Sequence, residues 1–148
     1  MIRLFGRTLR GRIVVAGVGR VDRRDDGAGP VLARRLASAP GIRTVDCGDR
    51  LEDFTADIAR LRPDILIVAD AVDLHAAPGS LALLEARDLP AGINAHDGTL
   101  RTAMDYLKAR AHAEVLLLAI QPGEVKDGVG LSAEVRATVD LLVDLFRV

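Results

Sequence analysis

Short, continuous apolar runs alternate along this chain with stretches in which apolar residues recur every three or four positions. The continuous runs predict strands, and they lie at 12–18, 42–46, 65–69, 81–84 and 115–120. The spaced residues predict amphipathic helices at 29–39, 54–61, 99–111 and 132–146. Strands that alternate with helices in this way are typical of a parallel sheet covered by helices on both faces.

The run at 81–84 is expected to depart from the parallel arrangement. It is short and follows the turn pair Pro78-Gly79, so the chain can return antiparallel there. We therefore predict an α/β fold: a single domain over residues 1–148, with a mostly parallel, five-stranded mixed sheet and helices on both faces. Residues 1–11 are rich in arginine, and we expect them to form a flexible, solvated basic arm.

Composition and charge narrow the class of protein. Twenty basic and 21 acidic side chains give a formal net charge of −1, which argues against a nucleic-acid partner held by overall charge. No apolar run approaches the roughly 18 residues that span a membrane, and the start of the chain lacks the apolar stretch of a secretory signal. The single cysteine excludes an internal disulfide and a multi-cysteine metal site. We expect a cytoplasmic protein with no membrane or nucleic-acid partner.

The loop after the first strand contains a glycine turn and a pair of acids. Gly17-Val18-Gly19 has the form in which a dinucleotide fingerprint begins, but Asp22 stands where the third glycine would be. A pyrophosphate needs a helix N-terminus without competing carboxylates, so nucleotide binding is the weakest interpretation. Asp25-Asp26, followed by Gly27-Ala28-Gly29, indicates either cation ligands beside small residues or caps of the next helix.

Further candidate ligands follow other strands of the predicted sheet. Asp70 ends the run at 65–69, where a partly buried carboxylate requires a partner. His96 lies in a loop expected to face the same edge. His75 is expected to be solvated, and His112 to lie at a helix end, where a partly charged imidazole suits the helix dipole. Because ligands bind beyond the carboxyl ends of parallel strands, one interpretation is an Asp/Asp/His site for a divalent metal ion there; the other is that Asp70 forms a turn, since Asp73, Pro78 and Gly79 follow. Such a site leaves coordination positions for a substrate or water.

Cys47 is a weak candidate for a nucleophile. It lies in Asp46-Cys47-Gly48-Asp49, where the neighbouring acids are expected to raise the pKa of the thiol. We interpret it as a small buried residue in a turn.

Several short motifs, taken in order, resemble the hydrogenase maturation protease family. They are GVG and DDGAGP in the first loop, DCG after the second strand, LIVADAVD and PGS at the third, a loop histidine, and AIQPGEV with GLS before the last helix. Each motif is weak alone, but the ordered set spans residues 12–148. The resemblance implies a mixed α/β sheet and an endopeptidase that trims the C-terminal extension from the large-subunit precursor of a nickel–iron hydrogenase.

The resemblance also implies roles for single residues. It places the metal ligands at Asp26, Asp70 and His96, and it implies that they recognise nickel already inserted in the precursor. The divalent metal would then arrive with the substrate, and cadmium or zinc is expected to substitute in vitro. Arg20 departs from the family, which usually has Asn there, and this implies altered specificity or a different large-subunit partner.

These residues lead to a hypothesis for the mechanism. A metal-bound substrate would be fixed and its peptide carbonyl polarised, with water as the nucleophile. Asp25 or Asp46 could be the general base, and the sequence does not choose between them. The chain has no HExxH motif of a conventional zinc protease. We expect a monomer, and the alternative function is a non-proteolytic nickel-binding accessory protein of hydrogenase assembly.

Overall fold

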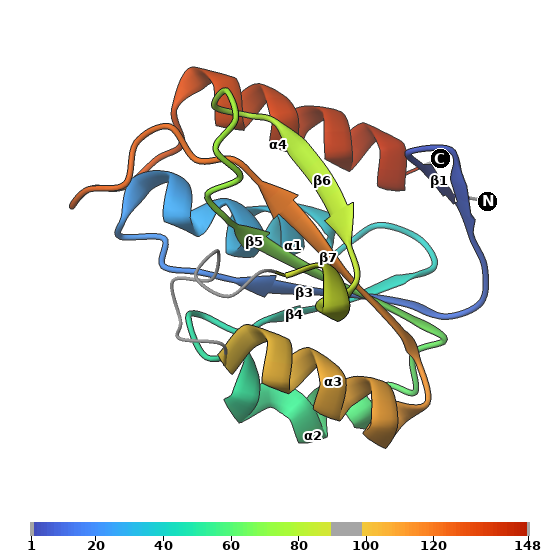
Figure 1. The fold of residues 1–148 in the computed structure, drawn as a ribbon. Coiled ribbons are helices and arrows are strands. Elements are labelled where there is room, and N and C mark those ends of the chain that lie inside the picture. Colours follow the sequence, from blue (N-terminus) through green and yellow to red (C-terminus); the bar gives the residue numbers. More distant parts are fainter. Residues whose placement is uncertain (1, 90–98, 148) are drawn as a thin grey trace.

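A five-stranded sheet forms the centre of the molecule in the computed structural model, which describes residues 2–89 and 99–147 (Figure 1). Its strand order is β4-β3-β5-β7-β6. The strands are β3 (Ile13–Val18), β4 (Ile42–Asp46), β5 (Ile65–Ala71), β6 (Leu81–Leu84) and β7 (Glu114–Ile120). All neighbours pair in parallel except β6, which runs antiparallel to β7. The predicted mixed sheet, including its one antiparallel strand, is confirmed.

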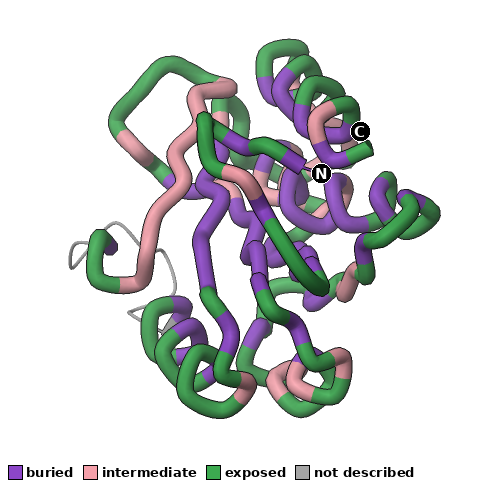
Figure 2. The backbone as a smooth tube through the Cα atoms, turned by 90° about the vertical axis from the view of Figure 1, so that its right-hand side faces the viewer, coloured by how far each residue is buried: buried purple, intermediate pink, exposed green. Residues whose placement is uncertain are grey.

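Helices cover both faces of this sheet. Helices α1 (Ala28–Leu36) and α4 (Ala133–Phe146) pack on one face, and α2 (Thr55–Arg60) and α3 (Thr99–Ala111) on the other. Three short 3-10 helices, η1 (Arg24–Gly27), η2 (Leu51–Phe54) and η3 (Ala86–Asp88), lie in connections. Alternate strand residues enter opposite cores, and the central strands are buried along their length (Figure 2). In the described residues, no helix is long and apolar enough to cross a membrane.

The N-terminal residues are structured, which corrects the expectation of a flexible basic arm. Strands β1 (Ile2–Leu4) and β2 (Arg7–Leu9) form an antiparallel hairpin. The side chains of Ile2, Leu4 and Leu9 are buried in the core that also contains α4. The prediction weighed the arginines and overlooked the three aliphatic side chains, whose burial holds the hairpin on the domain.

The strand register gathers the candidate residues at one edge of the sheet. Gly17 in β3 pairs with Asp46 in β4, and Val18 pairs with Asp70 in β5. Asp70 is therefore the penultimate residue of its strand, and β5 extends one residue beyond it. The loops that follow β3, β4, β5 and β7 all begin at this edge, which we call the carboxyl edge.

Candidate functional site

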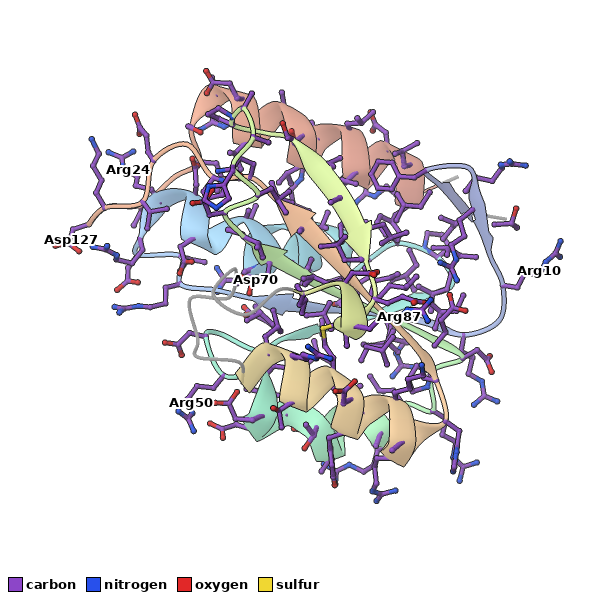
Figure 3. All side chains as sticks on the ribbon, viewed as in Figure 1. Arg10, Arg24, Arg50, Asp70, Arg87 and Asp127 are labelled. Carbon is purple, nitrogen blue, oxygen red and sulfur yellow. The ribbon has the colours of Figure 1, made fainter. Side chains whose placement is uncertain are left out.

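Asp70 is a buried acid without full hydrogen bonding. Its side chain lies at the carboxyl end of β5 and is only 2% exposed (Figure 3). Within the described part of the chain, its Oδ1 atom has no hydrogen-bond partner. Burial, and secondly the nearby charge of Asp26, raise the pKa of Asp70 well above its usual value, while the Ala71 amide opposes this rise. An isolated buried carboxylate is costly, so Asp70 requires a proton or a cation.

Asp26 supplies a second carboxylate beside Asp70. It lies in η1 and is half-buried, and its Oδ2 accepts a hydrogen bond of 3.0 Å from the Arg20 amide. The charge of Asp26 contributes to the raised pKa of Asp70, which places the two acids within electrostatic range of each other. Two of the three predicted ligands therefore lie within electrostatic range of each other at the carboxyl edge.

Glycines explain why this loop can lie so close to the strand ends. Gly19 has a φ of +141°, and a Cβ atom there would lie 1.9 Å from the Asp26 carbonyl oxygen. A Cβ atom on Gly29 would lie 2.1 Å from the carbonyl oxygen of Ala69 in β5. Only glycine permits such backbone contacts, so the GVG and GAG motifs serve the packing of η1 and α1 against β3 and β5.

The third predicted ligand, His96, lies outside the described residues. The other histidines are both exposed: His75 lies in the loop after β5, solvated as expected, and His112 directly follows α3, at the helix end where it was expected. No group of three His, Cys, Asp or Glu side chains is assembled in residues 2–89 and 99–147. The paired carboxylates with one unpartnered buried oxygen nevertheless fit a divalent cation, which prefers such oxygen donors and would neutralise both charges.

Asp25, the other acid of the pair, is fully buried and fully bonded. Its Oδ2 accepts hydrogen bonds from the amides of Gly123 and Glu124, both at 2.8 Å. The amide of Ser132 donates to Oδ1, and its hydroxyl donates to Oδ2, both at 2.7 Å. Although burial opposes it, these donors lower the pKa of Asp25 below its usual value. With an exposed fraction of 0%, the carboxylate has no surface that a substrate could contact.

The Asp25 side chain joins η1 to the loop between β7 and α4, residues 121–132, which we call the 121–132 loop. Backbone hydrogen bonds reinforce the junction, from Arg24 to Gly128 and from Asp25 to Glu124. Arg23 also pairs with Asp127, which projects at this side of the molecule (Figure 3). Ser132 occupies the N-cap position of α4 as expected, but its side chain makes no capping bond because it donates to Asp25.

Asp46, the other candidate base, also accepts hydrogen bonds from within the protein at both of its oxygens. Its Oδ2 accepts a 2.8 Å bond from Nε of Arg34 on α1, and its Oδ1 accepts a 3.2 Å bond from the Gly48 amide. Asp46 lies at the carboxyl edge, but β3 separates its strand from β5. The side chain therefore links β4 to α1 and fixes the turn after β4.

Gln121 is a positioning residue that the sequence analysis did not single out. It is 7% exposed and directly follows β7. Its Oε1 accepts a 2.5 Å bond from the Leu74 amide, and its Nε2 donates to Asp73 at 3.3 Å. Gln121 thereby fixes the loop that follows β5 and Asp70. An amide side chain directly after a continuous apolar strand was the signal available in the sequence.

Cys47 is buried, as expected. Burial, with contributions from Asp46 and Asp57, raises the pKa of its thiol to about 12. The thiol is therefore protonated at neutral pH and is not a nucleophile.

Comparison with known proteins identifies a matching family and several relatives of this chain. A family model described as "Hydrogenase maturation protease" matches residues 30–146. The hydrogenase 3 maturation protease of Escherichia coli K12 is 34% identical over 113 residues, which are 74% of this chain and 72% of that protein. The hydrogenase expression/formation protein HoxM of Azotobacter vinelandii is 30% identical over 140 residues, which are 86% of this chain and 67% of that protein.

Solved structures have the same fold. A nickel–iron hydrogenase maturation protease, HycI from Thermococcus kodakarensis, superposes with a TM-score of 0.82 at 26% identity, covering 90% of this chain and 88% of that one. The solution structure of the endopeptidase HycI from E. coli gives a TM-score of 0.82 at 28% identity, covering 93% of this chain and 90% of that one.

Proposed function

Because this chain belongs to the hydrogenase maturation protease family, we propose that it removes the C-terminal extension of a nickel–iron hydrogenase large-subunit precursor once nickel is inserted. Membership of the family makes the chain a peptidase of hydrogenase maturation. The precursor as substrate, the recognition of nickel and the residues that perform it are the proposal.

One buried oxygen of Asp70 has no hydrogen-bond partner in residues 2–89 and 99–147, and this observation supports nickel recognition most strongly. Asp26 lies within electrostatic range of Asp70, and a divalent cation bound at the carboxyl edge would stabilise both carboxylates. In the proposal the nickel belongs to the precursor, and Asp26, Asp70 and His96 complete its coordination. An empty precursor would leave two acids facing each other without a cation, so it would bind less tightly.

Nickel held in this way would fix the adjoining peptide bond near the site and polarise its carbonyl group. A water molecule would be the nucleophile. Asp25 and Asp46 are poorly suited to activate it, because donors within the protein occupy both carboxylates. We therefore assign Asp25 the role of holding Asp26 in place. Asp26 and Asp70 are then the acids that activate the water molecule.

Cleavage of a purified precursor tests this proposal. We expect the wild-type chain to shorten nickel-loaded precursor, detected by mass spectrometry, and to leave nickel-free precursor intact. Asp70→Ala should abolish cleavage while the circular dichroism spectrum stays unchanged. Asp49→Ala is the matched control, because Asp49 is an exposed acid in the loop after β4 at the same edge.

Each other outcome contradicts a separate part of the proposal. Equal cleavage of both precursor forms would contradict nickel recognition, and full activity of Asp70→Ala would contradict the ligand assignment. Nickel binding without any cleavage would favour the alternative, an accessory protein that carries nickel without hydrolysis.

A further inference from the structure

The outer side of β6 is an open sheet edge. The Gln121 amide donates to the Ser80 carbonyl, and Val72 donates to Ile120 on the other side of β7. Because backbone groups alternate in direction along a strand, Ala82 and Leu84 bond to β7, whereas the amides and carbonyls of Leu81 and Leu83 point away from it. Among the described residues, β7 is the only strand that pairs with β6.

The two edges of the sheet differ in their side chains. Edge strand β4 has an exposed arginine, Arg43, and two further polar residues among its five, which is a common protection against pairing with another chain. Edge strand β6 has the sequence LALL and no charge or proline within it. All four of its residues are half-buried. An unprotected apolar edge is expected where a polypeptide is meant to bind.

Both faces beside this edge are apolar. Leu81 and Leu83 pack against the core that contains α4, and Ala82 and Leu84 pack against the opposite core. Above the start of β6, Thr138 of α4 donates a 2.7 Å bond to the Gly79 carbonyl. Leu141 follows three residues later on that helix and is 53% exposed.

We propose that the outer edge of β6 binds an extended segment of the large-subunit precursor by strand addition. This inference rests on the proposed function. The register supports this occupant, because Ala82 pairs with Ala119, and Ala119 pairs with Asp70. The start of β6 is thus level with the candidate site, and only β7 lies between them. A peptide that leaves this edge at the start of β6 would reach Asp70 by crossing the ends of β6 and β7.

The strand spacing sets the distance between the bound segment and the cleaved bond. Neighbouring strands lie about 4.8 Å apart, so an added strand would run about 14 Å from β5. An extended chain covers this distance in about four or five residues at ~3.3 Å each. The paired segment is therefore expected to begin about five residues from the cleaved bond.

A pocket lies where β6 ends and η3 begins. Its lining includes two bases, Arg87 and Lys108, three acids, Glu85, Asp105 and Glu114, and the apolar Met104, and its volume is about 150 Å³. Arg87 projects at this end of the strand, away from Asp70 (Figure 3). A segment that followed the edge from the site would reach this pocket, which has room for one side chain.

Leu83→Pro tests the proposal selectively. Proline removes the amide that points away from β7 and leaves the bonds between β6 and β7 intact, which edge strands tolerate. We expect the KM for nickel-loaded precursor to rise at least about tenfold, from a lost hydrogen bond and steric exclusion, with kcat nearly unchanged. Leu83→Val keeps the amide and should behave as wild type. A folded Leu83→Pro variant with the wild-type KM would overturn the proposal.

Amide hydrogen exchange followed by NMR tests the same edge without a variant. The probe is a synthetic peptide that covers the cleaved bond of the precursor and ten residues on each side. We expect the amides of Leu81 and Leu83 to become protected, while those of Ala82 and Leu84 are protected already and serve as internal controls. Unchanged exchange of both outward amides at millimolar peptide would overturn strand addition.

The outcomes separate this inference from the proposed function. Cleavage of nickel-loaded precursor, combined with a neutral Leu83→Pro variant and unprotected amides, would overturn only the inference. Loss of cleavage by the wild-type chain would overturn the proposed function, while the exchange experiment would still report on the edge. A concentration-dependent dimer that Leu83→Pro converts to a monomer would identify a second copy as the occupant and would also overturn the proposal.

Discussion

Two aspartates at the carboxyl edge, Asp25 and Asp70, are both inaccessible to solvent but have opposite environments. Asp25 receives four hydrogen bonds from the 121–132 loop, and its pKa is lowered. Asp70 has an oxygen without a partner among the described residues, and its pKa is raised. The donors around Asp25 replace the water that burial removed, whereas those around Asp70 do not.

The difference shows that burial by itself does not identify a functional acid. A carboxylate whose charge is fully compensated within the fold has no chemistry left for a ligand, and it contributes stability. A carboxylate whose charge is left uncompensated destabilises the fold until a cation arrives. A buried carboxylate with an uncompensated charge is expected at sites where function outweighs stability.

Among the substitutions that test this comparison, Asp25→Ala is expected to have the largest effect on stability. It leaves two loop amides and both donors of Ser132 without an acceptor, so the free energy of unfolding should fall by about 3 to 5 kcal/mol. Urea denaturation measures this loss. Asp127→Ala is the control, because its exposed pair with Arg23 should contribute less than about 1 kcal/mol. If the two variants were equally stable, the structural role assigned to Asp25 would be contradicted.

Asp70→Asn should change the free energy of unfolding in the opposite direction, by raising it at neutral pH. In wild type, the unfolded chain releases the Asp70 proton near its ordinary pKa, whereas the folded chain retains it to a higher pH. Between these two values the stability of wild type falls with rising pH, by at most about 1.4 kcal/mol per pH unit from this group. Asparagine removes this dependence, so the variant should be more stable than wild type at neutral pH. Thermal melting at pH 4 to 8 without metal measures it, and a less stable variant at neutral pH would contradict the comparison.

Ser132→Ala is a milder test of the Asp25 environment. It removes the hydroxyl donor but keeps the Ser132 amide, and the remaining three bonds still hold the carboxylate. The free energy of unfolding should fall by about 1 kcal/mol. The loss should grow as the pH rises through the range, below the ordinary pKa of an aspartate, in which Asp25 ionises in the folded chain, because the lowered pKa makes the ionised form the stabilised one. Denaturation curves at pH 3 and pH 7 distinguish this from simple loss of packing, which would give equal losses.

Asp26→Asn should have the smallest effect of the four substitutions, and the effect is expected on the pKa of Asp70. The charge of Asp26 is the lesser cause of the raised pKa of Asp70, since burial is the larger one. The pKa of Asp70 should therefore fall but stay above its ordinary value. Carboxyl-carbon NMR chemical shifts during a pH titration measure this change, with Asp49→Asn as the control. An unchanged Asp70 titration would show that the two acids are not close enough to share a cation.

The regular parts of the fold were predictable because their signals are local. The continuous apolar runs at 13–18 and 65–69 are strands, and the spaced apolar residues at 133–146 form a helix, since burial periodicity follows directly from backbone geometry. The N-terminal hairpin was missed because its strands have only three residues each and three arginines outweighed their apolar residues.

The candidate site was predicted only in part. The position of Asp70 follows from the end of an apolar strand, and the direction of the pKa shift of Cys47 was predicted from its acidic neighbours, although burial is the larger cause. The roles of Asp25, Asp46 and Gln121 did not follow from the sequence, because their partners are distant along the chain. Gly123 and Ser132 lie 98 and 107 residues from Asp25, and nothing near Asp25 signals them.

The sequence by itself determined the α/β class, the strand that turns antiparallel and the edge at which the acids gather. These depend on periodicity, turn residues and strand direction, which are properties of neighbouring residues. Only the tertiary structure decided that Asp25 is fully hydrogen-bonded within the fold, whereas Asp26 lies within electrostatic range of Asp70. That choice depends on where the 121–132 loop places its amide donors, and the packing of α4 and β7 sets those positions.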